Sequence, residues 1–98
     1  MNLSIEPEAE NDLKQFDVEH RKFILEKLRE LEEKPTGHEN SDTIRIKGRQ
    51  VFKYVMKQGS RGGKDYRAVY DIRDNKIKVI AIFHRDKGYR KEKLDGRV

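Results

Sequence analysis

The chain has 98 residues, no cysteine, 42% charged residues and a formal net charge of +5. This length suits a single small domain over residues 1–98 with one modest core, and the lack of cysteine excludes disulfides, thiol nucleophiles and thiolate metal sites. No apolar run approaches the roughly 18 residues of a membrane span, and the first residues are unlike a signal peptide. We therefore expect a cytoplasmic protein without a membrane partner.

Charge divides between the two halves of the chain. Residues 1–42 contain 6 Lys or Arg and 12 Asp or Glu, a net of −6, whereas residues 43–98 contain 17 and 6, a net of +11. A positive surface attracts polyanions such as nucleic acid, or an acidic protein. Charge runs are also common on ordinary solvated surfaces, but the division by segment favours a binding surface.

The acidic half predicts a strand and two helices. Residues 2–5 alternate as a short strand does, and Pro7 suits the first turn of a helix predicted over residues 7–16. Asp17 is a good N-cap for a second helix, which ends at the Pro35-Thr36-Gly37 sequence. Each helix has an apolar stripe at helical spacing, so we expect a helical hairpin that packs against a sheet.

The basic half predicts four strands, at residues 43–47, 51–57, 66–72 and 76–83. The last two are joined by a turn at Asp74-Asn75 and should lie at the centre of the sheet. Continuous apolarity indicates that the last strand is covered on both sides; strict alternation would place Ile77, Val79, Ala81 and Phe83 on one face and Ile80 and Ile82 on the other. Short connections favour antiparallel pairing. The predicted fold is α+β, with an N-terminal strand and a two-helix hairpin packed on a mainly antiparallel sheet of four to five strands.

Basic side chains recur at every second position of the predicted strands: Arg45, Lys47, Arg49, Lys53, Lys57 and Arg67. Residues two apart on a strand share a face, so these side chains would line the sheet surface opposite the helices and grip a phosphate backbone. Four tyrosines are candidates to stack on an unpaired base: Tyr54, Tyr66, Tyr70 and Tyr89. Alternating Lys and Arg is equally typical of an ordinary exposed sheet or a protected edge.

Arg67 lies within an otherwise apolar and aromatic strand, where an unpaired charge is costly. Its partner should be Asp71 on the same face, an acid from the helices, or a substrate phosphate. A structural ion pair is the commoner explanation for a single arginine of this kind, although Arg85 and Tyr89 nearby favour a phosphate.

The sequence His84-Arg85-Asp86-Lys87-Gly88-Tyr89 collects groups useful for catalysis. A histidine exchanges protons near neutral pH, an arginine stabilises charge on a phosphoryl group, and a tyrosine donates a hydrogen bond. RNA cleavage needs no more, because the 2′-hydroxyl of the substrate is the nucleophile. The alternatives are a structural role for His84 and pairing of Asp86 with Arg85.

Other kinds of site have little support in the sequence. His20 and His38 are not spaced as metal ligands, and no phosphate loop or dinucleotide-binding motif is present. We expect no metal and no cofactor.

Three segments together resemble the RelE/ParE superfamily of toxin–antitoxin toxins, and its RelE-like branch more closely. They are Ile-Arg-Ile-Lys-Gly at residues 44–48, Asp-Tyr-Arg-Ala-Val-Tyr at residues 65–70 and His-Arg-Asp-Lys-Gly-Tyr-Arg at residues 84–90. Their order and spacing, and the preceding helical hairpin, match the family over nearly the whole chain.

The resemblance implies a metal-independent endoribonuclease that cleaves mRNA in the ribosomal A site by 2′-hydroxyl attack and so inhibits translation. Its partners would be mRNA, the ribosome and a cognate acidic antitoxin with a helical segment. The implied catalytic residues are Arg67 and Arg85 at the scissile phosphate, His84 as general acid or base, and Tyr89 as an orienting or proton-transfer group. The RNA-binding candidates are Arg45, Lys47, Lys53, Lys57, Arg61 and Arg90.

Two alternatives remain within the same family. One is a ParE-like toxin that inhibits DNA gyrase by protein binding, and the other is a non-catalytic RNA-binding or partner-binding module. Val55 also departs from the pattern, because some family members carry a second basic residue at that position.

Overall fold

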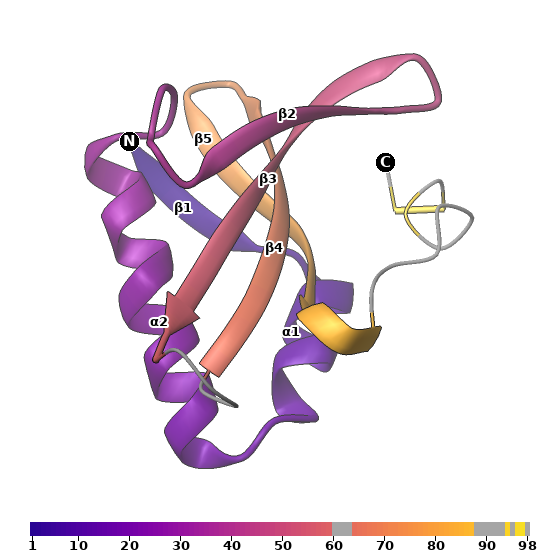
Figure 1. Cartoon of the computed structure of the whole chain (residues 1–98). Coiled ribbons are helices and arrows are strands. Elements are labelled where there is room, and N and C mark those ends of the chain that lie inside the picture. The colour runs from indigo at the N-terminus through magenta and orange to yellow at the C-terminus, as the bar shows by residue number, and fades with distance from the viewer. Residues whose placement is uncertain (60–63, 88–93, 95, 98) are drawn as a thin grey trace.

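The computed structural model describes residues 1–59, 64–87, 94, 96 and 97 (Figure 1). The elements, in chain order, are β1 (Asn2–Ile5), α1 (Pro7–Lys14), α2 (Val18–Glu33), β2 (Ser41–Ile46), β3 (Arg49–Gln58), β4 (Lys64–Arg73), β5 (Lys76–His84) and a 3-10 turn (Arg85–Lys87). They form a five-stranded sheet in the order β1-β5-β4-β3-β2. β1 runs parallel to β5 and the other neighbours are antiparallel. The predicted α+β architecture is confirmed, and no helix in the described part of the chain is long and apolar enough to span a membrane.

Local sequence signals explain where the elements begin and turn. The Asp17 carboxylate accepts a hydrogen bond from the backbone N–H of His20 at 2.9 Å, which caps α2 as predicted. Asp74 and Asn75 both have positive φ, 53° and 60°, as a two-residue turn between twisted antiparallel strands requires. Lys47 and Gly48 form the same kind of turn between β2 and β3, with φ of 54° and 74°.

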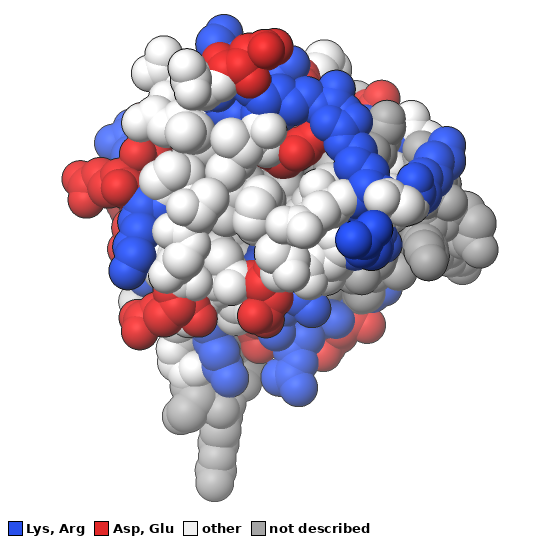
Figure 2. Space-filling model, turned by 90° about the horizontal axis from the view of Figure 1, so that it is seen from above, with Lys and Arg blue, Asp and Glu red and all other residues white. Residues whose placement is uncertain are grey.

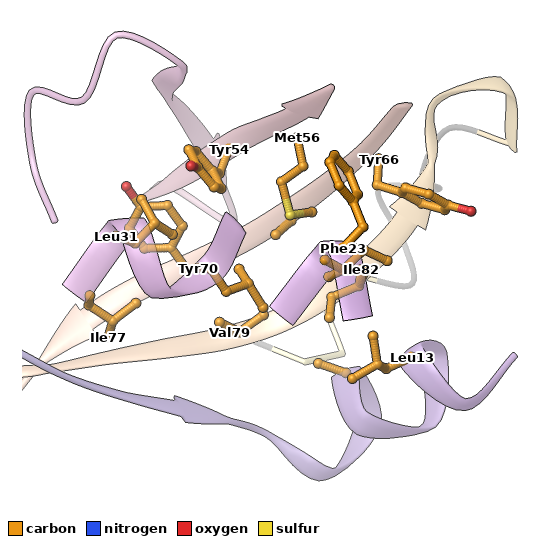
Figure 3. Close-up of a cluster of buried hydrophobic side chains, with 14 residues drawn as sticks. Leu13, Phe23, Leu31, Tyr54, Met56, Tyr66, Tyr70, Ile77, Val79 and Ile82 are labelled. Atoms are coloured by element: carbon orange, nitrogen blue, oxygen red, sulfur yellow. The ribbon is translucent and has the colours of Figure 1, made fainter. Parts of the chain in front are cut away.

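The main core lies between the two helices and one face of the sheet, here called the helix face (Figure 3). Tyr54 and Tyr70 are fully buried there. The Tyr54 hydroxyl donates to the Glu30 carboxylate at 3.1 Å, and the Tyr70 hydroxyl donates to the Pro35 carbonyl at 3.0 Å. Because Tyr66 is also buried, the prediction that these three tyrosines stack on bases is wrong.

The opposite side of the sheet, here called the open face, carries a second apolar cluster. Its members are Ile46, Val51, Val69, Ile80, Ala81 and Leu94, with Ile44 and Phe83 packed against them. Leu94, from the C-terminal segment, is only 2% exposed. β5 is therefore covered on both sides, as its apolar sequence indicated.

A β-bulge in β5 changes the expected alternation of its side chains. Val69 pairs with Ala81 and Tyr70 pairs with Val79, so Ile80 is an extra residue. Ile80 and Ala81 consequently both belong to the open-face cluster, whereas Ile82 belongs to the helix-face core. The predicted grouping of Ala81 and Phe83 with Val79 is wrong because strict alternation takes no account of the extra residue.

Two side chains satisfy the backbone of β5 where β1 no longer pairs with it. Asp12 of α1 accepts a hydrogen bond from the Ile82 N–H at 3.0 Å, and Arg97 donates to the Ile80 carbonyl at 2.9 Å. Asp12 and Arg97 also bond to each other at 2.6 Å, and this bond raises the pKa of the Arg97 guanidinium. Asp12 and Arg97 thus make the hydrogen bonds to β5 that the next residues of a neighbouring strand would otherwise make.

We predict that Asp12→Asn lowers the free energy of unfolding by about 2 kcal/mol, because it removes charge-assisted hydrogen bonds in a largely buried position. The measurement is urea denaturation followed by circular dichroism. Glu10→Gln is the matched control, since it removes one carboxylate charge from an exposed position of the same helix. Equal destabilisation by the two variants would contradict the assigned role of Asp12.

Candidate active site

The register of the strands defines which basic side chains share the open face. Lys57 lies opposite Asp65, Val55 opposite Arg67, and Lys53 opposite Val69. Because paired residues in an antiparallel sheet point to the same side, the two lysines lie on the face that holds Arg67 and Val69. Arg49 pairs with Ile46 of the open-face cluster. Four of the predicted basic residues, Arg49, Lys53, Lys57 and Arg67, therefore lie opposite the helices.

The site centres on a carboxylate that holds two arginines. One oxygen of Asp65 accepts a hydrogen bond from Arg67, and the other lies 3.4 Å from Nη1 of Arg85. The exposed fractions of these side chains are 12% for Asp65, 18% for Arg67 and 61% for Arg85. Burial raises the pKa of Asp65, but hydrogen bonds and charge from Arg67, and then Arg85, outweigh burial and hold this pKa below its usual value.

Asp65 is a site residue that the sequence did not single out. Asp71, one of the partners considered for Arg67, bonds instead to Arg49 at 2.6 Å and Arg73 at 2.9 Å. Both carboxylates are an even number of residues from Arg67, so both share its face. Spacing along one strand does not distinguish them.

Arg67 has apolar neighbours on the two adjacent strands. It lies opposite Val55 of β3 and Phe83 of β5, and its Nη1 also donates to the Tyr66 carbonyl at 3.2 Å. These surroundings reduce access of water to one side of the guanidinium and strengthen its interaction with an anion. Arg85 and Lys57 supply the more exposed positive charge beside it.

His84 lies on the helix face, on the other side of the sheet from Asp65. Its register partner is Tyr66, with the ring centroids 5.2 Å apart. The Nδ1 atom of His84 accepts a hydrogen bond from the Asp86 N–H at 3.1 Å, and the Asp86 carboxylate lies 3.7 Å away. Asp86 thus lies beside His84, whereas Arg85 pairs with Asp65. This position of His84 follows from the bulge. The bulge puts Phe83 on the open face, so the next residue, His84, lies on the helix face.

Tyr66 connects His84 to a second histidine. Its hydroxyl bonds to Nδ1 of His20, and Nε2 of His20 lies 3.9 Å from the Asp17 carboxylate. Burial, and then the charge of Asp17, raises the pKa of Tyr66. The group lies where the N-terminus of α2 meets the end of β5.

The remaining basic candidates are dispersed. Arg45 lies opposite Gln50, out of phase with Lys53, and donates to the Gly48 carbonyl at 3.2 Å, while Lys47 is in the β2–β3 turn. In Figure 2, which views the hairpin end of the sheet, Lys and Arg are interspersed with Asp and Glu around a largely uncharged area. The predicted line of basic side chains thus excludes Arg45 and Lys47, and its open-face member Arg49 is paired with Asp71. The structure does not describe three further candidates, Arg61, Tyr89 and Arg90.

Within the described ranges, no group of three or more His, Asp or Glu residues is arranged to hold a metal ion. Around Asp65 the open face brings together two arginines, Arg67 and Arg85, with Lys57 opposite the carboxylate in the sheet register. Such an arrangement is suited to binding a phosphodiester and stabilising added charge on it.

Comparison with solved structures shows the same fold. The chain matches the RelBE2 toxin–antitoxin complex of Mycobacterium tuberculosis with a TM-score of 0.65 and 18% identity, covering 86% of this chain and 96% of that one. The E. coli RelBE complex matches with a TM-score of 0.61 and 23% identity, covering 91% of this chain and 98% of that one. The archaeal RelE–RelB complex of Pyrococcus horikoshii matches with a TM-score of 0.66 and 20% identity, covering 89% of this chain and 97% of that one.

Comparison of sequences gives the family. No curated protein matches the chain. The family model described as the ParE toxin of the type II toxin–antitoxin system parDE matches residues 3–89, which include both helices and all five strands. The chain therefore belongs to the ParE toxin family of the RelE/ParE superfamily.

Proposed function

We propose that the protein is a ribosome-dependent endoribonuclease that cleaves mRNA in the A site and so inhibits translation. The observation that carries this proposal is the convergence of Arg67 and Arg85 on Asp65, with Lys57 opposite that carboxylate. A toxin that acts only by protein binding does not need two guanidiniums directed at one point of the surface. A nuclease does, because charge accumulates on the phosphoryl oxygens in the transition state.

The proposed reaction transfers the phosphoryl group within the RNA. The 2′-oxygen forms a bond to phosphorus, the bond from phosphorus to the 5′-oxygen breaks, and the products are a 2′,3′-cyclic phosphate and a free 5′-hydroxyl. The proton lost from the 2′-hydroxyl leaves to a base, and another proton is delivered to the departing 5′-oxygen. Arg67 and Arg85 bind the scissile phosphate, and Tyr89 is the proposed proton-transfer group. His84, which the resemblance implies for the same role, lies on the helix face, away from this phosphate.

RNA contacts beyond the scissile phosphate are proposed for the other basic candidates. Lys53 and Lys57 are best placed, since they share the open face with Arg67. Arg45, Lys47, Arg61 and Arg90 would contact the RNA or the ribosome outside this centre. Each exposed cation adds to affinity for a polyanion and makes binding dependent on salt.

We also propose that an antitoxin holds the protein inactive in the cytoplasm. The three solved structures reported above are complexes of a RelE-type toxin with its antitoxin. The residues from 43 to 98 carry a net charge of +11, which suits an acidic partner with a helical segment.

A second function, inhibition of DNA gyrase by protein binding, has one observation in its favour. The matching family model is described by the ParE toxin and not by RelE. The same purified protein distinguishes the two functions.

We predict that the purified protein cleaves a defined mRNA only when programmed ribosomes are present. The measurement is mapping of the 5′ ends of the products by primer extension, with the protein assayed in parallel for inhibition of gyrase supercoiling. Cuts confined to the A-site codon support the proposal. Absence of cuts together with gyrase inhibition would overturn it and establish the ParE-like function.

We predict that Arg85→Ala lowers kcat for this cleavage by at least about 100-fold, because it removes a group that stabilises transition-state charge. Folding should be little changed, since the Arg85 side chain is 61% exposed. Arg73→Ala is the control: it removes an exposed arginine paired with the other open-face aspartate and should leave kcat nearly unchanged.

We predict a smaller loss of kcat for His84→Ala than for Arg85→Ala. The reason is that His84 lies on the helix face against Tyr66, away from the carboxylate that gathers the arginines. The two variants are compared in the same ribosome assay at saturating mRNA. A larger loss for His84→Ala would identify proton transfer, and not phosphate binding, as the dominant contribution.

A further inference from the structure

Two aspartates on the open face of β4 are each paired with two arginines. Asp65 lies close to Arg67 and Arg85, and Asp71 lies close to Arg49 and Arg73. The exposed fractions of the two carboxylate side chains are 12% and 13%. Each therefore satisfies the general requirement that a largely buried carboxylate be paired with cations.

The two groups differ in how the carboxylate oxygens are used. At Asp71, the same oxygen, Oδ2, accepts from both arginines. At Asp65, Oδ1 binds Arg67 and Oδ2 faces Arg85. The Asp65 carboxylate thus lies between two guanidiniums from different elements, with one oxygen toward each.

Without Asp65, little would keep Arg85 beside Arg67. Arg85 is the first residue of the 3-10 turn after β5, and its side chain is the most exposed of the three. Long exposed side chains lose considerable rotamer entropy when fixed in one place. A weak hydrogen bond of 3.4 Å biases the position of Arg85 while leaving its other donors available to an anion.

We infer that Asp65 is a positioning residue that holds Arg67 and Arg85 as a convergent pair for a single phosphate group; this inference rests on the proposed function. The carboxylate does not touch the substrate. It orients two cations before the RNA arrives, at the cost of adding one negative charge close to the phosphate. Removal of Asp65 should therefore lower turnover without lowering affinity, whereas loss of a purely structural ion pair would not separate the two.

The test is Asp65→Asn in the ribosome-dependent cleavage assay, together with binding of a non-cleavable mRNA that has a 2′-deoxy nucleotide at the cut site. We expect kcat to fall by about tenfold or more, as for loss of other groups that orient active-site residues. Affinity for the non-cleavable mRNA should be unchanged or tighter, because a negative charge is removed.

Asp71→Asn is the matched control, since it makes the same chemical change on the same strand and face at nearly equal burial. It should leave kcat unchanged. The inference is overturned if Asp65→Asn loses no more activity than Asp71→Asn, if it gains activity, or if its turnover and affinity fall together.

A second measurement needs neither a stable variant nor cleavage. Inorganic phosphate is titrated into the wild-type protein with ¹⁵N-labelled arginine, and the side-chain Nε signals are followed by NMR. The Arg67 and Arg85 signals should shift together with one dissociation constant, while those of Arg49 and Arg73 stay in place. Separate dissociation constants for Arg67 and Arg85, or equal responses from all four arginines, would overturn the inference even if the protein proves to be a gyrase inhibitor.

Discussion

The bulge at Ile80 is the constraint on which the arrangement of both sheet faces depends. With Ile80 as an extra residue, Ala81 and Phe83 point to the open face, and Ile82 and His84 point to the helices. The backbone groups at the bulge are satisfied from outside the sheet, by Asp12 and Arg97. A bulge of this kind redirects the side chains that follow it, and here it separates His84 from Arg67.

Several arginines of the C-terminal half are neutralised by ion pairs, which leaves an excess of positive charge near Asp65. Arg49 and Arg73 are paired with Asp71, and Arg97 with Asp12. Around Asp65, by contrast, two arginines share one carboxylate, and Lys57 lies opposite it in the sheet register. A small excess of charge at a rigid, partly apolar position binds a phosphate more selectively than a uniformly basic surface, because its donors are fixed in direction and partly desolvated.

Much of the fold could be predicted from local signals, and the details of the site could not. The cap at Asp17 and the turn at Asp74-Asn75 depend on residues close in sequence, and both were predicted. The parallel pairing of β1 with β5 and the bulge depend on contacts between distant residues, such as the bond from the Ile82 N–H to Asp12, so periodicity did not indicate them. Of the partners considered for Arg67, Asp71 is wrong for a related reason: Asp65 and Asp71 lie on the same face, and only the position of Arg85 in space distinguishes them.

The bulge also affects how this chain should be compared with its relatives. In a relative that lacks the extra residue, the strand corresponding to β5 would be one residue shorter at this point. Its open-face side chains would stay the same, because in this chain Val69 pairs with Ala81 and Tyr70 with Val79 on either side of the bulge. Alignments that forbid a gap inside β5 would then match helix-face positions of one protein with open-face positions of the other. At identities of 18–23%, one misplaced gap is enough to assign His84 to the column of a phosphate-facing residue.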